Sequence, residues 1–136
     1  MGGGRWASRR RECTLDLVVG FRYDVREWTG DNVLGKLEPI YDRQPPGTQQ
    51  LVIARDGYAV GGLVVDAGKF VQAVRVIFMM LDGDHLDSHD SYQSEWLGNP
   101  SADEPKTLAG NGQMVVGVYG GHGIILDSVG LVLRKR

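Results

Sequence analysis

The sequence predicts an all-β domain, and three observations support this fold class. Val, Ile and aromatic residues recur in short runs, with turn signals every ten residues or so. Glycine contributes 20 of the 136 residues and proline five, which favours many tight turns over long helices. No segment keeps a helical period for long enough to predict a helix. The length suits a single domain with a real core.

The first half of the chain predicts three strands. Residues 14–25 combine β-branched and aromatic residues with partial alternation. After a turn cluster, residues 33–42 form a second strand, and Pro39 indicates an edge or a bulge because proline cannot donate to a sheet ladder. A short strand at 51–54 follows a proline-rich loop.

The second half predicts five more strands, one of them a short strand within a long polar loop. Residues 58–68 and 69–81 read as two strands joined by an Asp-Ala-Gly turn, although 69–81 also fits a buried helix. Residues 82–106 are polar and acidic and predict a loop with a short strand at 92–97. The last two strands form a hairpin that covers 113–133.

Three segments of the chain share one pattern, which suggests an internal repeat. The copies cover residues 18–41, 59–78 and 115–133. Each opens with a valine and a glycine, the glycines being Gly20, Gly61 and Gly117. Each closes on an apolar strand with aligned residues Leu37, Val74 and Val129, then Ile40, Ile77 and Val132. Three such hairpins predict approximate threefold symmetry, as three sheets of a prism or as a β-trefoil.

The third copy, "GVYGGHGIILDSVGLVL", resembles the closing hairpin of jacalin-related lectins without a gap. The matching residues are Gly117, Gly120, Gly123, Asp127, Ser128, Val129 and Gly130. The resemblance extends over residues 14–133 and is specific in the last twenty. It implies a β-prism I fold, with three antiparallel sheets about a pseudo-threefold axis, over residues 14–136. Residues 1–13 are then a flexible Gly/Arg-rich N-terminal segment.

The same resemblance implies non-catalytic carbohydrate binding by a Gly-x-x-x-Asp loop, without a metal or another cofactor. The implied site residues are Gly120, Gly121, His122, Gly123, Ile124, Ile125 and Asp127. The partner is then a mono- or oligosaccharide. A carboxylate accepts charge-assisted hydrogen bonds from neighbouring sugar hydroxyls, and glycines let the backbone approach the ligand closely.

One departure from the family pattern, and a second possible role for Asp127, leave alternatives open. The family often stacks an aromatic residue of the loop on the sugar, whereas this chain has Ile124 and Ile125, so that Tyr119 or His122 would have to take this role. Asp127 also suits a second role, which is to cap its own turn. The rival interpretation is therefore a structural or protein-interaction β-prism module that contacts other copies or other domains of a parent chain.

Other candidate sites have weaker support. His85 and His89, four apart in an acidic stretch, would share a zinc ion only on a helix, and a calcium loop lacks the required spacing. Trp96 is the tryptophan expected to be most exposed. Arginines and lysines at both chain ends would form a basic patch if the ends converge: Arg5, Arg9, Arg10, Arg11, Arg134, Lys135 and Arg136.

The remaining features of the sequence argue against several classes of protein. The net charge of −2 gives no reason to expect nucleic acid. One cysteine, Cys13, cannot form an internal disulfide. No apolar run reaches the roughly 18 residues of a membrane span, and no signal peptide is recognisable. Nucleophile-elbow, P-loop and dinucleotide motifs are missing, so that an enzyme is not predicted.

Overall fold

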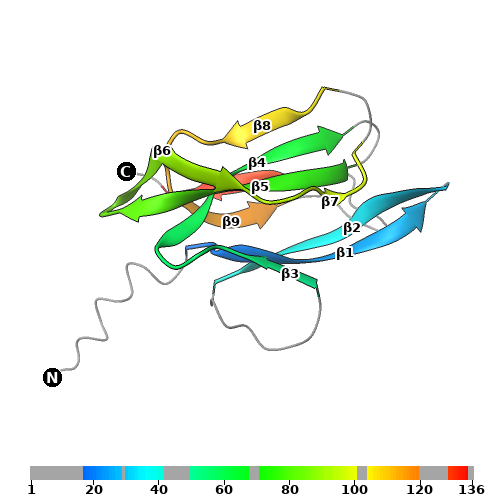
Figure 1. Cartoon of the computed structure of the whole chain (residues 1–136), viewed down its shortest axis with the longest axis horizontal. Coiled ribbons are helices and arrows are strands. Elements are labelled where there is room, and N and C mark those ends of the chain that lie inside the picture. The colour runs from blue at the N-terminus through cyan, green and yellow to red at the C-terminus, as the bar shows by residue number, and fades with distance from the viewer. Residues whose placement is uncertain are drawn as a thin grey trace, which may run out of the picture.

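The computed structural model describes residues 17–28, 30–41, 50–67, 71–100, 104–119 and 129–134. These residues form antiparallel β-strands and no helix (Figure 1), which confirms the all-β class. The strands are β1 (Gly20–Trp28), β2 (Asp31–Ile40), β3 (Gln50–Ile53), β4 (Tyr58–Ala67), β5 (Val71–Asp82), β6 (His85–Gln93), β7 (Leu97–Gly98), β8 (Lys106–Ala109), β9 (Val115–Tyr119) and β10 (Gly130–Leu133).

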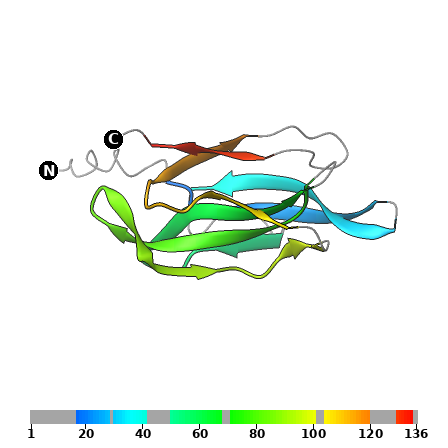
Figure 2. The same cartoon turned by 90° about the horizontal axis from the view of Figure 1, so that it is seen from above.

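The described strands make three sheets. One sheet has the order β2-β1-β3, and a larger one has the order β6-β5-β4-β8, with β7 also pairing with β5. The third sheet is the β9–β10 hairpin. Seen from above in Figure 2, this hairpin lies along one edge of the molecule beside β2, and β9 contacts β2.

Several strand predictions are confirmed by the pairing. β2 is an edge strand, as Pro39 indicated, and Pro39 lies opposite Phe21 of β1. Gly30, with a φ of 91°, supplies the left-handed residue that the β1–β2 turn requires. The alternative helix over 69–81 is wrong, because β5 pairs with β4 along nearly its whole length.

The prediction of a loop over residues 82–106 is wrong. β6 occupies most of the first half of this stretch, turning back from β5 at Gly83, where φ is 66°. Its register with β5 runs from Asp82 opposite His85 to Ile77 opposite Gln93. Leu86 is the one buried residue in β6. A strand needs little hydrophobic content of its own when a neighbour supplies the hydrogen-bond ladder and the other side chains face water.

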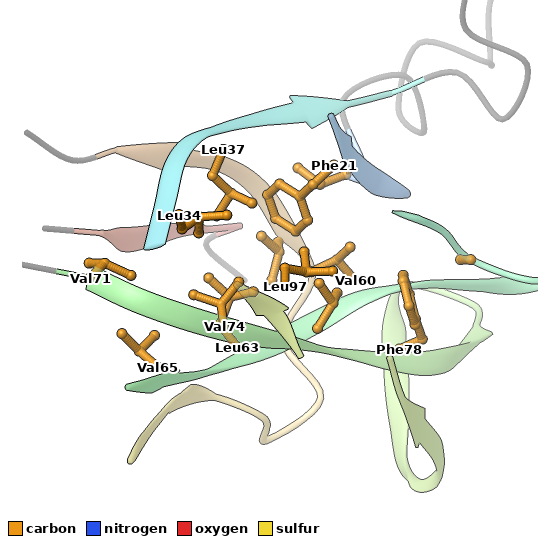
Figure 3. Close-up of a cluster of buried hydrophobic side chains, with 14 residues drawn as sticks. Phe21, Leu34, Leu37, Val60, Leu63, Val65, Val71, Val74, Phe78 and Leu97 are labelled. Carbon is orange, nitrogen blue, oxygen red and sulfur yellow. The ribbon is translucent and has the colours of Figure 1, made fainter. Parts of the chain in front are cut away.

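The core lies between the sheets. Its main cluster joins apolar residues from the β1–β2 hairpin with residues of β4, β5 and β9. Figure 3 shows these side chains pointing toward one another: Phe21, Leu34 and Leu37 on one side, and Val60, Leu63, Val74 and Phe78 on the other. Burial of these side chains is the main contribution to stability, at roughly 25 cal/mol per Å² of apolar surface.

The segment before β1 connects all three sheets through its backbone. Val18 donates its N–H to the carbonyl of Val115 in β9, at 3.0 Å, and accepts from the N–H of Val60 in β4, at 2.9 Å. Val19 donates to the carbonyl of Ile40 in β2, at 2.8 Å. The relative placement of the sheets is therefore fixed by hydrogen bonds that do not depend on side-chain identity.

The repeat inferred from the sequence corresponds to three hairpins, β1–β2, β4–β5 and β9–β10. In the first and third copies, the opening glycine lies opposite the closing aliphatic residue. In the middle copy, Gly61 lies in a β-bulge, and Gly62 lies opposite the closing residue instead. These cross-strand pairs are Gly20 with Ile40, Gly62 with Ile77, and Gly117 with Val132.

The opening glycines differ in the space around them, which gives a test of the packing. A Cβ at Gly20 would collide with the Val52 carbonyl oxygen and lie 2.9 Å from Ile53 Cα, so that backbone would have to move. We expect Gly20→Ala to lower the free energy of unfolding by about 2 kcal/mol. Urea denaturation followed by tryptophan fluorescence measures this loss.

Gly117→Ala is the matched control. A Cβ there would lie 3.6 Å from Val132, which is ordinary van der Waals contact. We expect the stability of this variant to stay within about 0.5 kcal/mol of the original chain. Equal losses for the two alanine variants would contradict the assigned packing.

Candidate functional site

The residues of the predicted sugar loop lie outside the described residues. They are Gly120, Gly121, His122, Gly123, Ile124, Ile125 and Asp127. The strands on either side are described: β9 ends at Tyr119 and β10 begins at Gly130, and these two residues lie directly opposite each other. The motif therefore belongs to the connection between two paired strands, as the sequence predicted.

The β9–β10 hairpin has an inner and an outer face. Val118 and Leu131 form a cross-strand pair, and both pack against the main core cluster. Neighbouring positions on a strand point to opposite faces. Tyr119 and Gly130, with Gly117 and Val132, therefore face outward.

On the outer face, the ring of Tyr119 lies over Gly130. A Cβ at residue 130 would overlap the ring at Cζ and lie 2.6 Å from Oη and 2.8 Å from Cε2. Cζ is the closest of the three atoms, and both of its bonded neighbours are farther away, so that Gly130 lies beneath the flat face of the ring and not at its edge. The missing side chain of Gly130 makes this arrangement possible, and Tyr119 still leaves 64% of its surface exposed.

Tyr41 and Val132 extend this outer face. They are 45% and 44% exposed, and together with Tyr119 they are the exposed large hydrophobic side chains among the described residues. Tyr41 donates its hydroxyl to the Val116 carbonyl, at 3.3 Å, and its Oη would lie 3.9 Å from a Cβ at Gly117. We call Tyr41, Gly117, Tyr119, Gly130 and Val132 the outer face of β9–β10; none of the five carries a charge at neutral pH.

A second cluster of aromatic and charged residues joins the β3–β4 turn to β6. Tyr58 donates its hydroxyl to Asp90 Oδ1 at 2.7 Å, and the Arg55 N–H donates to the Tyr92 hydroxyl at 2.8 Å. The Arg55 guanidinium lies 4.0 Å from the Tyr92 ring centroid. Tyr58 approaches the same ring edge-on at 5.2 Å, and Phe78 lies 5.1 Å from it.

The polar groups of this cluster hydrogen-bond within it, and three side chains lie against its central ring, that of Tyr92. The pKa of Tyr58 lies above its ordinary value, and the main cause is the hydrogen bond to Asp90. Arg55, Tyr58 and Phe78 all contact the Tyr92 ring, so that these interactions tie β6 to its neighbours within the protein. We therefore assign the cluster a structural role, which is to hold β6 against the β3–β4 turn.

The described part of the acidic stretch with two histidines contains no cluster of side chains that could hold a metal ion. The described residues contain no group of three His, Cys, Asp or Glu side chains that could hold an ion. His85 lies near Asp82 and Asp84, at 3.4 and 3.3 Å, in the exposed β5–β6 turn. His89 is on the same strand. Because both histidines lie on a strand, they do not have the i, i+4 helical arrangement on which the zinc interpretation depended.

Two further expectations concern Trp96 and the basic chain ends. Trp96 is half-buried, not exposed, and the Arg75 guanidinium lies 5.6 Å from its ring. The Arg134 guanidinium points at Met114 Sδ, at 3.4 Å. The other terminal arginines and lysines, and the predicted segment 1–13, fall outside the described residues.

Comparison of the chain with protein-family models, with curated proteins and with solved structures gave no match. Within the described ranges, no helix is long and apolar enough to cross a membrane.

Sequence reasoning identified Tyr119 as a stacking candidate only on condition that it faced the loop, and it missed Tyr41. Tyr41 comes near β9 because the end of β2 lies beside β9, a contact across about 75 positions of the chain. The Tyr119–Gly130 pair did leave a signal in the sequence, since an aromatic residue opposite a glycine is a recognised cross-strand combination.

The Tyr58–Asp90 hydrogen bond gives a pH-dependent test. Because the folded-state pKa of Tyr58 exceeds its ordinary value of 10.0, the linked stability is fully present below that pH. It is lost as the pH rises through the folded-state pKa. We expect Asp90→Asn to lower the pKa of Tyr58 toward the ordinary value, as measured by NMR titration of tyrosine labelled with ¹³C at Cζ.

Asp87→Asn is the control, because the Asp87 carboxylate accepts from the His89 N–H and is not the acceptor for Tyr58. It should leave the Tyr58 titration unchanged. If Tyr58 titrates in the Asp90→Asn variant as it does in the original chain, Asp90 is not the cause of the raised pKa.

Proposed function

We propose that this chain is a non-catalytic carbohydrate-binding domain of the jacalin-related type, with its site in the loop between β9 and β10. Asp127 is the principal acceptor for sugar hydroxyls. Residues 120–125 supply backbone donors around it. Neither a metal nor another cofactor takes part in the proposed recognition.

The observation that carries this proposal is the pairing of Tyr119 with Gly130. A paired strand end on each side limits the separation of the two ends of the intervening segment. That segment contains the Gly-x-x-x-Asp motif, from Gly123 to Asp127. Recognition loops on rigid strands are a common arrangement, because the scaffold bears the entropy cost of holding the loop ends.

The sheet arrangement supports the finer fold proposal, a β-prism I with pseudo-threefold symmetry. The described residues form three antiparallel sheets, and each sheet contains one of the three repeated hairpins. The aligned residues Leu37 and Val74 are buried in the main core cluster, and Val129 packs against it. Equivalent positions of the three copies thus face a shared interior, as a threefold prism requires.

The chemistry of the motif matches a neutral polyol. An ionised carboxylate has two oxygens that accept from adjacent hydroxyls, and such charge-assisted bonds are stronger than neutral ones. Glycine on each side of His122 leaves backbone N–H groups unshielded by side chains. These groups donate to the same ligand.

The proposal is tested by glycan-array screening, followed by calorimetric titration of the mono- or oligosaccharide with the strongest signal. We expect Asp127→Asn, which keeps the shape but removes the charge, to weaken binding at least tenfold. This corresponds to the loss of one hydrogen bond to a charged group, about 1.5 kcal/mol or more.

Glu104→Gln is the control, since it removes one exposed carboxylate far along the chain from the motif. Its affinity should equal that of the original chain. The proposal fails if the original chain binds none of the array's mono- or oligosaccharides at millimolar concentration. Equal affinities for Asp127→Asn and the original chain would leave Asp127 with the turn-capping role.

A further inference from the structure

We infer that Asn111 is a site of covalent self-modification, at which the side-chain amide is lost as ammonia and an aspartate or an isoaspartate forms. Asn111 lies in the turn between β8 and β9 and is followed by Gly112. The reaction needs water but no enzyme, and it is independent of sugar binding. It is expected here because of the residue after Asn111 and the hydrogen bond of its side chain, and the packing of Gly112 determines its effect.

Asn111 differs from the other two asparagines of the chain in the residue that follows it. Asn32 precedes a valine, whose branched side chain crowds the backbone nitrogen, and Asn99 precedes a proline, which has no N–H. Gly112 has an N–H and no side chain beside it. All three asparagines are exposed. The nucleophile of the reaction is the backbone nitrogen of the next residue, and it is therefore least hindered after Asn111.

The side chain of Asn111 is folded back over the peptide bond to Gly112. Its Oδ1 accepts a hydrogen bond from the Gln113 N–H at 3.3 Å, which is the arrangement of an Asx-turn. Negative charge develops on this same oxygen when the Gly112 nitrogen attacks Cγ of Asn111. A donor that is already directed at the position of a developing charge stabilises the transition state. The turn therefore supplies both the nucleophile and a donor for the oxyanion.

The reaction has two steps that balance. The Gly112 nitrogen loses its proton to water and bonds to Cγ of Asn111. The bond from Cγ to Nδ2 breaks, and Nδ2 takes up a proton and leaves as ammonia, so that a succinimide ring remains. Water then adds to one of the two ring carbonyls. Opening at Cγ gives aspartate, whereas opening at the main-chain carbonyl carbon gives isoaspartate, in which the backbone runs through Cβ and Cγ.

Two other turns of the chain provide an internal comparison. Asp56 and Asp82 each precede a glycine with a positive φ, as Asn111 does. Their ionised carboxylates are poor electrophiles, because the negative charge repels the deprotonated backbone nitrogen. We therefore expect these two turns to stay unchanged over the time in which Asn111 reacts.

The packing of Gly112 makes the two products differ in stability. The Gly112 carbonyl accepts a hydrogen bond from the Leu86 N–H at 2.7 Å, and a Cβ on Gly112 would lie 2.7 Å from the Leu86 carbonyl oxygen. This contact joins the β8–β9 turn to the buried residue of β6. Aspartate leaves the backbone as it is. Isoaspartate adds one carbon atom to the backbone before Gly112, which displaces Gly112 from Leu86.

The experiment incubates the full chain at mildly alkaline pH and body temperature and follows each asparagine by peptide mapping with mass spectrometry. We expect conversion at Asn111 to be about tenfold faster, or more, than at Asn32 or Asn99. The rate should rise with pH, because the Gly112 nitrogen must lose its proton. No conversion at Asn111, or equal rates at the three asparagines, would overturn the inference.

Asn111→Gln is the matched variant, because its longer side chain would have to close a larger ring. It should remain unmodified under the same conditions, and a mass change at residue 111 in this variant would contradict the succinimide route.

The effect on stability is measured with Asn111→Asp, which reproduces one product and keeps an acceptor for the Gln113 N–H. Its melting temperature should equal that of the original chain. The isoaspartate form, separated from the aged chain by chromatography and identified by electron-transfer fragmentation, should melt lower. We expect its equilibrium constant for unfolding to be about fivefold larger, as for the loss of one backbone hydrogen bond. Equal stability of the two forms would overturn the role given to the contact between Gly112 and Leu86.

Discussion

Four backbone hydrogen bonds made by Val18 and Val19 join parts of the chain that belong to three different sheets. Val18 bonds to Val115 of β9 and to Val60 of β4. Val19 donates to Ile40 of β2 and accepts from the N–H of Ala54, which follows β3, both at 2.8 Å. An extended segment can do this because its successive N–H and C=O groups point to opposite sides. Backbone hydrogen bonds of this one segment thus link the three sheets to one another.

The side chains of the same segment connect the two halves of the core. Val18 is fully buried in the main cluster, between the sheets. Leu17 and Val19 alternate with it and belong to the second cluster, with residues such as Ile40 and Ile77. One short extended stretch therefore supplies both the hydrogen bonds between sheets and a contribution to each core. A polar residue at Val18 would disturb all three sheets, because buried polar groups without a partner are costly.

Local pattern was enough to predict the strands that carry their own hydrophobic residues. β4 and β5 are rich in valine and buried on both faces, and their pairing was predictable from the turn between them. β6 was not predictable, because Leu86 is its one buried residue and its strand form depends on the ladder offered by β5. β8 was missed for a similar reason: its residues are exposed or half-buried, and it is held by pairing with β4. Such strands are determined by tertiary context and not by local propensity.

The local features of the candidate site were predictable from the sequence, whereas its tertiary contacts were not. The motif and its position in a hairpin came from the sequence, because they depend on residues close together in the chain. The contact of Tyr41 with β9 could not be predicted, since it depends on how β2 lies beside β9. The orientation of Tyr119 depended on the register, because a shift of one residue would have turned the ring into the core.

The three repeated hairpins differ in how much of their surface the core uses, and this difference favours the third as the place for a binding site. Ile40 and Ile77 are buried in the second core cluster, whereas Val132, at the aligned position, is exposed. Gly20 and Gly61 have atoms pressed against them, whereas Gly117 has room for a methyl group. The outer face of β9–β10 thus contributes little to packing. Its exposed residues Tyr41, Tyr119 and Val132 are therefore less constrained by packing than the aligned residues of the other two hairpins.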